Sequence, residues 1–177
     1  MTATSLLLEP GVGALSIDGR GLLLRLEHSL RAPLDDVWKV LTASPHREHW
    51  IACASVGELR AAATVQPPFW PTALDTRTVD VSVSGVTREW QPPSVFKWTA
   101  EEGHVTWELG HLHDATTVVA ELRIDDDDRD VAAQRCADFQ VGFAQLIRVC
   151  NSQPVLTPTC ATYLALAAHH RSALAAP

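Results

Sequence analysis

The chain has 177 residues, of which 46% are hydrophobic and 20% are charged, and 21 acidic residues outweigh 14 lysines and arginines to give a net charge of −7. This length is typical of a single globular domain, and the composition excludes a disordered chain. The acidic balance removes the electrostatic attraction that drives binding to nucleic acid or to an anionic membrane surface. No apolar run reaches the roughly 20 residues that cross a bilayer, and no secretory signal is recognisable, so we expect a cytoplasmic protein.

The N-terminal part of the chain is expected to hold a loose arm and one long strand. Glycine and proline are frequent in residues 1–20, which leaves room for only a short strand at Ala14–Ile17. Apolar and polar residues then alternate from Leu22 to Arg31, and this period of two predicts a strand with one buried side. The predicted buried side consists of Leu24, Leu26, His28 and Leu30.

Two short helices are predicted after this strand. Pro33 suits the first turn of a helix, and Asp35 and Asp36 favour its positive N-terminal end. Ser44 precedes a proline in the pattern of a helix start, which predicts a second helix from Pro45 to about Ile51. The first helix has one apolar face, formed by Leu34, Val37, Trp38 and Leu41.

An antiparallel meander of strands is predicted in the middle of the chain. Turn residues at Pro92–Pro93, Glu102–Gly103 and Asp114 separate apolar segments at regular intervals. Residues 62–75 contain three prolines, so we predict a loop or an edge segment there rather than a central strand. The predicted strands are Ala54–Ala61, Thr76–Trp90, Val95–Ala100, His104–Leu112 and Thr116–Asp125.

Two helices are predicted in the C-terminal part. The acidic run Asp125–Asp130 is favourable before a helix N-terminus, and the helix that follows is expected to span Val131–Asn151. The alanine-rich segment Thr159–Ala175 predicts a further helix. The apolar stripe of the longer helix is formed by Cys136, Phe139, Phe143, Leu146, Ile147 and Cys150.

The sequence predicts no metal or cofactor site. The four cysteines form no Cys-x-x-Cys pair, and a chain of this length needs no disulfide, so we interpret them as reduced thiols. His46 with His49, and His111 with His113, are spaced to share a face, but neither pair has a third ligand placed by spacing. The acidic run lacks the glycine and the terminal glutamate of a calcium-binding loop.

Three segments of the chain carry motifs of a known superfamily. Residues 24–50 read LRLEHSLRAPLDDVWKVLTASPHREHW, a strand followed by short helices that end on a tryptophan. Residues 86–110 read VTREWQPPSVFKWTAEEGHVTWELG, with a double proline, an aromatic strand and a Trp-Glu-Leu strand. Residues 133–154 read AQRCADFQVGFAQLIRVCNSQP, a closing helix. These motifs resemble the START-like (SRPBCC) superfamily, in the branch of activators of the heat-shock-protein ATPase.

The chain departs from the pattern of this branch at two places. Its members often carry Phe-Pro after the tryptophan of the second helix, where Ile51-Ala52 stand here. They often carry Gly-Trp-His in the closing helix, where this chain has Asp138-Phe139-Gln140, so any chemistry of that histidine is missing at this position. With the resemblance we expect an N-terminal arm (1–20), a START-like domain (21–154) and a C-terminal helical extension (155–177).

The resemblance implies an α+β fold of the helix-grip type, in which a curved antiparallel sheet surrounds a long C-terminal helix. It also implies an internal cavity that binds a hydrophobic or aromatic small molecule, as in a carrier, sequestration or resistance protein. A cofactor-independent cyclase, aromatase or lyase-like enzyme of specialised, polyketide-like metabolism is the alternative, and a co-chaperone ATPase activator is a weaker one. Homodimerisation is left open.

Aromatic residues are the main candidates for the ligand-binding site. Phe139 and Phe143 lie one turn apart on the closing helix and would form one wall of the cavity. Trp98 either lines the cavity or belongs to the core. Trp50, Trp70 and Trp90 lie near the ends of predicted helices and strands, and for them pocket lining and simple packing are equally plausible. The candidate aromatic ligand-binding residues are Trp50, Trp70, Trp90, Trp98, Phe139 and Phe143.

Fewer polar residues are candidates for the ligand-binding site. His49 could serve as an acid–base group at the mouth of the cavity or stand on the surface. Glu89, Glu108 and Glu121 interrupt apolar strands, and a carboxylate facing a dry cavity would exchange protons near neutral pH. The alternation of their neighbours favours an outward direction for Glu108 and Glu121, and no residue is singled out as catalytic.

Overall fold

The computed structural model describes residues 12–18, 21–43, 64–65, 85–100, 103–125, 128–155 and 159–175. Several predicted features lie outside these residues: the helix at Pro45–Ile51, the strand at Ala54–Ala61 and the first part of Thr76–Trp90. Among the described residues, no helix combines the length and the apolar character needed to cross a membrane.

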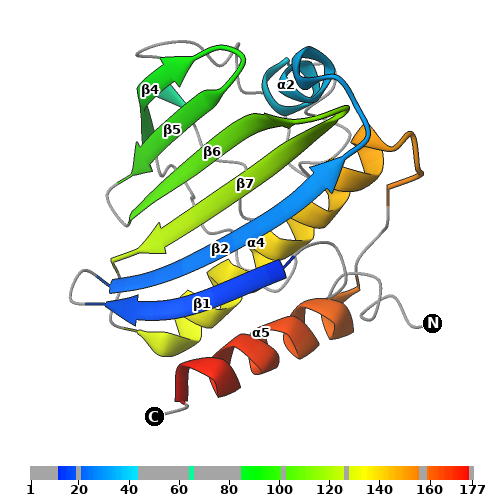
Figure 1. Cartoon of the computed structure of the whole chain (residues 1–177). Coiled ribbons are helices and arrows are strands. Elements are labelled where there is room, and N and C mark those ends of the chain that lie inside the picture. The colour runs from blue at the N-terminus through cyan, green and yellow to red at the C-terminus, as the bar shows by residue number, and fades with distance from the viewer. Residues whose placement is uncertain are drawn as a thin grey trace.

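The described strands form one antiparallel sheet in the order β1-β2-β7-β6-β5-β4-β3 (Figure 1). The central strands are joined by tight turns, so each pairs with its neighbour in the chain, whereas β2 comes early in the chain and lies beside β7. The strands are β1 (Val12–Asp18), β2 (Gly21–Leu30), β3 (Thr64–Val65), β4 (Gly85–Gln91), β5 (Val95–Ala100), β6 (Gly103–Leu112) and β7 (Ala115–Ile124).

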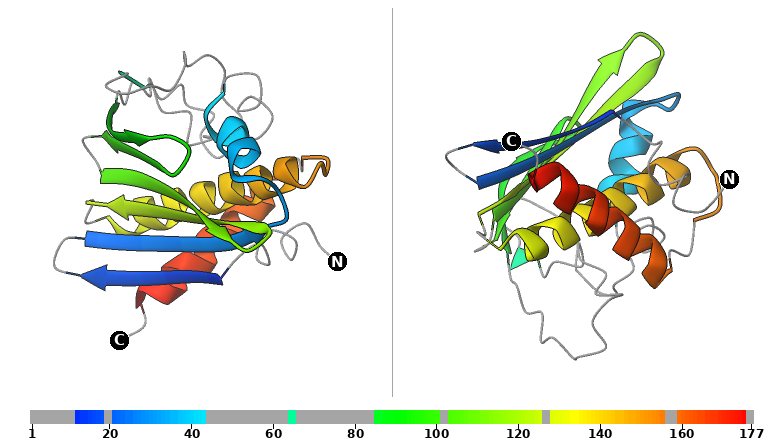
Figure 2. Two further views of the ribbon diagram at one scale, coloured as in Figure 1. Left: turned by 45° about the horizontal axis from the view of Figure 1, so that its top comes forward. Right: turned by 90° about the horizontal axis from the view of Figure 1, so that it is seen from below.

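Three described helices lie on one side of this sheet: α2 (Leu34–Thr42), α4 (Arg129–Cys150) and α5 (Cys160–Ala175). Figure 2 shows α4 running across one face of the sheet and α5 lying against α4. Helix α4 also contacts α2, and α5 contacts β1. This architecture confirms the predicted α+β helix-grip fold, and α4 begins at Arg129, two residues before the predicted start.

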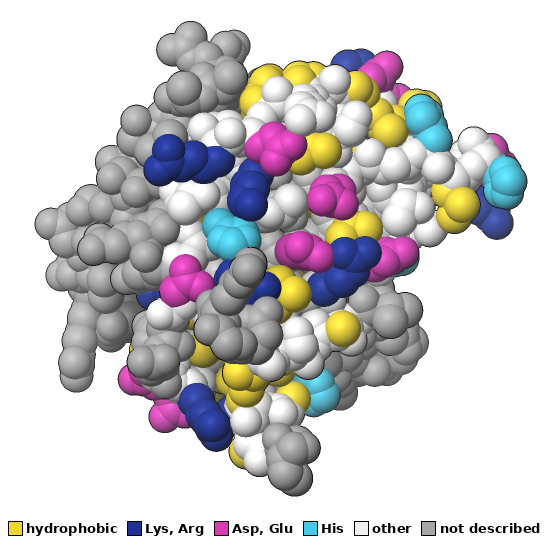
Figure 3. All heavy atoms as spheres, turned by 60° about the vertical axis from the view of Figure 1, so that its left-hand side comes forward, with side chains coloured by type: hydrophobic (Ala, Val, Ile, Leu, Met, Phe, Trp, Pro, Cys, Tyr) yellow, Lys and Arg dark blue, Asp and Glu magenta, His cyan; other side chains and the backbone are white. Residues whose placement is uncertain are grey.

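The strands bury one face only, as their alternating sequences predict. In β2 the predicted inner side is buried at Leu24, Leu26 and Leu30, with His28 partly buried. On the outer face Arg25 contacts Glu121 of the neighbouring strand at 2.7 Å. Figure 3 shows acidic, basic and histidine side chains mixed over a face that the strands expose. Water therefore covers one side of the sheet and helix α4 covers the other.

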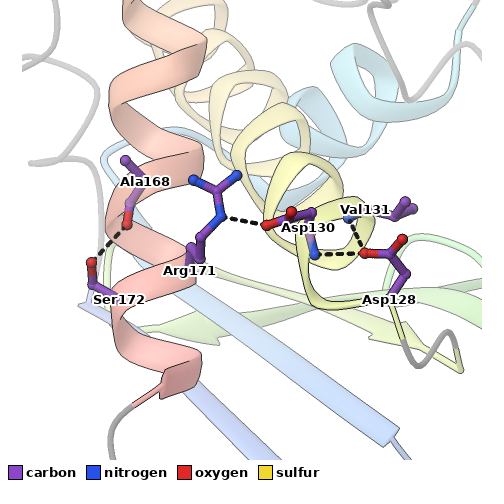
Figure 4. A network of polar contacts seen from close by, with 6 residues as sticks. All are labelled: Asp128, Asp130, Val131, Ala168, Arg171 and Ser172. Atoms are coloured by element: carbon purple, nitrogen blue, oxygen red, sulfur yellow. Dashed lines mark hydrogen bonds and ion pairs between the residues drawn. The ribbon is translucent and has the colours of Figure 1, made fainter.

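Helix α4 begins with a side-chain cap. The Asp128 carboxylate accepts hydrogen bonds from the backbone N–H groups of Asp130 (2.9 Å) and Val131 (3.3 Å), which satisfies two otherwise free donors of the first turn. Asp130 in turn pairs with Arg171 of α5, as Figure 4 shows. The acidic residues at the N-terminus of α4 were thus predicted, and the Asp130–Arg171 ion pair also links α4 to α5.

Helix α5 packs beside α4, at the edge of the sheet formed by β1. A second apolar cluster joins Ala137, Val141 and Ala144 of α4 to Tyr163, Leu166 and Ala167 of α5. His170 is buried at the edge of this cluster, and its Nε2 lies 2.9 Å from Gln140 Oε1, which accepts the hydrogen bond. The small alanines allow the two helix backbones to approach closely.

Gly103 provides a direct test of the turn between β5 and β6. Its φ of +140° is rare for other residues, and a Cβ atom there would lie 2.0 Å from the carbonyl oxygen of Arg123. Gly103→Ala should therefore lower the free energy of unfolding by about 2–4 kcal/mol in urea denaturation. Gly110→Ala is the matched control, because a Cβ atom at Gly110 meets nothing within 4 Å. Equal stability of the two variants would contradict this account of the turn.

His170 predicts a loss of stability in acid. Burial, with a smaller contribution from His169, lowers the pKa of His170 to about 4 from its ordinary 6.5. The folded protein holds the neutral imidazole, so this stability is fully present above pH 6.5 and is lost as the pH falls toward 4, by at most about 1.4 kcal/mol per pH unit. Stability measured by urea denaturation between pH 7 and pH 4.5 should fall less steeply in His170→Gln than in the wild type. His169→Gln, on the exposed side of the same helix, should keep most of the wild-type slope, because burial is the larger cause of the shift at His170.

Candidate functional site

The inner face of the sheet carries two aromatic clusters. Under α4, the Trp107 ring of β6 lies with its centroid 5.7 Å from Phe139 and 6.1 Å from Phe143. Because the two phenylalanines are one helical turn apart, both reach the same tryptophan. Near α2, the Trp90 ring lies 5.1 Å from Trp38 and 5.7 Å from Phe96. Together the clusters form a nearly continuous aromatic surface.

Trp98 and Thr87 lie opposite each other on β5 and β4, on the same inner face. Trp98 is almost fully buried, and so is the Thr87 side chain. The Thr87 hydroxyl oxygen has no hydrogen-bond partner among the described residues. A buried hydroxyl in this state costs free energy, so it is a natural contact for a bound water or ligand. The irregularity in β4 between Thr87 and Glu89 lets Trp90 join the inner face as well.

Helix α4 adds a polar flank beside Phe139. Asp138 is partly buried, and burial raises the pKa of its carboxyl to about 8 from an ordinary 3.8. The carboxyl is therefore mostly protonated near pH 7 and can donate a hydrogen bond or a proton. Gln145, buried two turns further along, lies on the same flank of the helix. Asp138 also acts on Tyr163 of α5, since burial and the Asp138 charge both raise the pKa of that phenol.

The structure brings four of the predicted ligand-binding residues to one side of the sheet. Trp98, Phe139 and Phe143 are buried there, and Trp90 is partly buried. Trp50, Trp70 and His49 lie outside the described residues, so their placement stays a prediction. The role of the whole set in ligand binding also stays a prediction.

The strand glutamates do not face the interior. Glu108 is exposed, and Glu121 pairs with Arg25 on the outer face, which agrees with the outward direction favoured by the sequence pattern. Glu89 is partly buried and accepts a hydrogen bond from the Gln91 amide at 2.8 Å. Asp138 was not among the predicted site residues, and in the sequence it stands out only as a departure from related helices. The available signal was a carboxyl directly before Phe139 in an apolar stripe.

Within the part of the chain that the structure describes, no group of three histidine, cysteine or acidic side chains is arranged to hold a metal ion. The described cysteines, Cys136, Cys150 and Cys160, are free. Burial raises the pKa of both Cys136 and Cys150 to about 12, so these thiols stay protonated and are poor nucleophiles. Among the polar side chains, Thr87 lies on the inner face of the sheet, whereas Asp138 acts on Tyr163 of α5.

Neither a protein-family model nor a curated protein matches the sequence of this chain. Solved structures do match its fold. A conserved protein of unknown function from Enterococcus faecalis, EF2215, has a TM-score of 0.72 and 13% identity and covers 97% of this chain and 93% of its own. CalU16 from Micromonospora echinospora has a TM-score of 0.65 and 16% identity, with coverages of 92% and 94%.

A third similar structure is the Aha1 dimer from Colwellia psychrerythraea, with a TM-score of 0.56, 11% identity and coverages of 72% and 94%. At these identities the matches show the fold alone. The chain has a START-like, helix-grip fold, as its sequence motifs imply.

The raised pKa of Asp138 predicts that its contribution to stability is lost as the pH rises, whereas the contribution of His170 is lost as the pH falls. The unfolded chain ionises this carboxyl above about pH 4, whereas the folded protein keeps it protonated up to about pH 8. Its contribution to stability is thus fully present below pH 4 and is lost as the pH rises to 8, by at most about 1.4 kcal/mol per pH unit. In urea denaturation, Asp138→Asn should gain stability over the wild type progressively from pH 5 to pH 8.

The matched control for this prediction is Asp125→Asn, which removes an exposed carboxyl of the same charge. Its stability difference from the wild type should stay nearly constant over the same range. Parallel pH profiles for Asp138→Asn and the wild type would show that the Asp138 carboxyl titrates normally in the folded protein.

Proposed function

We propose that this protein binds a hydrophobic or aromatic small molecule between α4 and the inner face of the sheet, as a carrier, sequestration or resistance protein. The observation that carries the proposal is the aromatic surface of Trp90, Trp98, Phe139 and Phe143, together with the buried Thr87 hydroxyl, which finds no partner in the described part of the chain. Ligand sites combine such apolar walls with a few polar groups that fix orientation. Trp50, Trp70 and His49 belong to the proposed site as further wall and mouth residues.

The polar group on the inner face of the sheet favours a largely uncharged ligand. The Thr87 hydroxyl can donate a hydrogen bond to a ligand or accept one from it. An anionic ligand would gain little from this neutral group. A cytoplasmic location is part of the proposal, and the free cysteines fit a reducing compartment.

Binding should be visible as thermal stabilisation with a panel of aromatic and polyketide-like compounds. A ligand at 100 times its dissociation constant adds about 2.7 kcal/mol, which for a chain of this size raises the melting temperature by roughly 5–10 °C. Thr87→Val should leave the free protein at least as stable, because it removes an unsatisfied hydroxyl, and should reduce the shift caused by oxygen-bearing hits.

Thr117→Val on the outer face of β7 is the control and should keep the full shift. The proposal fails if no compound in the panel stabilises the protein. It also fails if every hit stabilises both threonine variants equally and leaves the fluorescence of the tryptophans unchanged.

A cofactor-independent cyclase or lyase-like enzyme is the alternative function. It is favoured by Asp138, whose carboxyl can give or take a proton near neutral pH. Such an enzyme would act mainly by desolvating and folding its substrate. Mass spectrometry of each binding hit after incubation separates the two functions: a carrier returns the compound unchanged, whereas an enzyme yields a product that Asp138→Asn fails to form while it still binds.

A co-chaperone role is the weaker alternative and has the likeness to the Aha1 fold as its support. A co-chaperone must bind the heat-shock protein and stimulate its ATPase. If this chain does neither, the co-chaperone role is excluded. The same likeness supports the proposal of a homodimer, which sedimentation equilibrium tests directly.

A further inference from the structure

A pocket of about 220 Å³ lies away from the aromatic surface, at the end of the sheet. Its walls come from the hairpin between β6 and β7 and from the connection between β2 and α2. Figure 1 shows the tip of this hairpin beside the start of α2. The Thr116 hydroxyl donates to the carbonyl oxygen of Ala32 at 2.7 Å, and this hydrogen bond holds the two walls together. This hydrogen bond therefore fixes the two walls of the pocket relative to each other.

The side chains around this pocket are rich in N–H donors. Arg31, His111 and His113 all line it. Within the described part of the chain, none of these three side chains forms an ion pair or a hydrogen bond, although other arginines do: Arg25 pairs with Glu121 and Arg171 with Asp130. A guanidinium presents a planar fork of N–H donors that matches a carboxylate or phosphate group.

The start of α2 adds to the positive character of the same pocket. Pro33 lines the pocket and is the N-cap of α2, and no side chain caps the helix. The positive end of the helix dipole and its free backbone N–H groups favour an anion there. Asp35 and Asp36 of the first turn are both exposed, and neither caps the helix. Asp36 is engaged with Lys39 at 3.2 Å.

We propose that this pocket binds a small oxyanion, either a free ion or the carboxylate or phosphate end of a larger molecule, held by Arg31 with support from His111 and His113. The volume equals roughly seven water molecules, which suits such a group and is below the size of a drug-like ligand. A cation is disfavoured because no metal-holding group occurs among the described residues and Arg31 would repel it. Asp114 also lines the pocket and weakens, without cancelling, the attraction for an anion.

The test is a titration of the ¹⁵N-labelled full chain with sodium phosphate in one arm and sodium acetate in the other, at constant pH and ionic strength. Saturable amide shifts confined to residues 31–34 and 111–116 are expected in at least one arm. Phosphate alone would assign a phosphate group, and acetate alone a carboxylate. Arg31→Gln should weaken binding at least roughly tenfold, because it removes a charge-assisted hydrogen bond.

Two further variants make the test specific for the pocket. Asp114→Asn should tighten binding about threefold, because it removes a like charge beside the anion. Arg129→Gln is the matched control: Arg129 is exposed at the start of α4, so the variant changes the net charge equally and should bind as the wild type does. Shifts that fail to saturate in both arms, or that persist unchanged in Arg31→Gln, overturn the proposal.

Discussion

The contact between α4 and the sheet through Trp107, Phe139 and Phe143 is the constraint on which the rest of the structure depends. The strands bury one face only, so without α4 the inner apolar face would lie in water. Each of these aromatic side chains is almost fully buried, and such burial contributes about 2–3 kcal/mol per residue. The stack also fixes the position of α4, and α2 and α5 both contact that helix.

The same packing leaves one polar group among the aromatic rings. Aromatic rings fill the described interior, yet Thr87 places within it a buried hydroxyl that has no partner among the described residues. This hydroxyl does not improve packing, and a valine would fit an apolar core better. Proteins usually keep such a cost where a bound molecule needs it. The proposed ligand site therefore depends on Thr87.

The fold could be predicted from the sequence because the patterns that indicate each strand and helix are local. The period of two in β2 and the apolar stripe of α4 each follow from a single element, and the buried residues agree with both patterns. The site was harder to predict, because it depends on contacts between elements. The irregularity near Thr87 shifts the alternation of β4 and turns Trp90 inward, which no window of sequence reveals. Asp138 occupies a predictable helix position, but its burial follows from tertiary packing.

Helix α5 shows why chemistry cannot be transferred from the fold alone. This helix lies beyond residue 154, outside the segments that resemble the superfamily, yet it packs beside α4 and places Tyr163 near Asp138. Burial and the charge of Asp138 raise the pKa of Tyr163, whereas burial alone raises the pKa of the Asp138 carboxyl. A protein with the same sheet and the same α4 but without α5 would leave this flank in water. Its acid would then lie in water and ionise in the ordinary range, so a neutral proton donor on α4 would be lost.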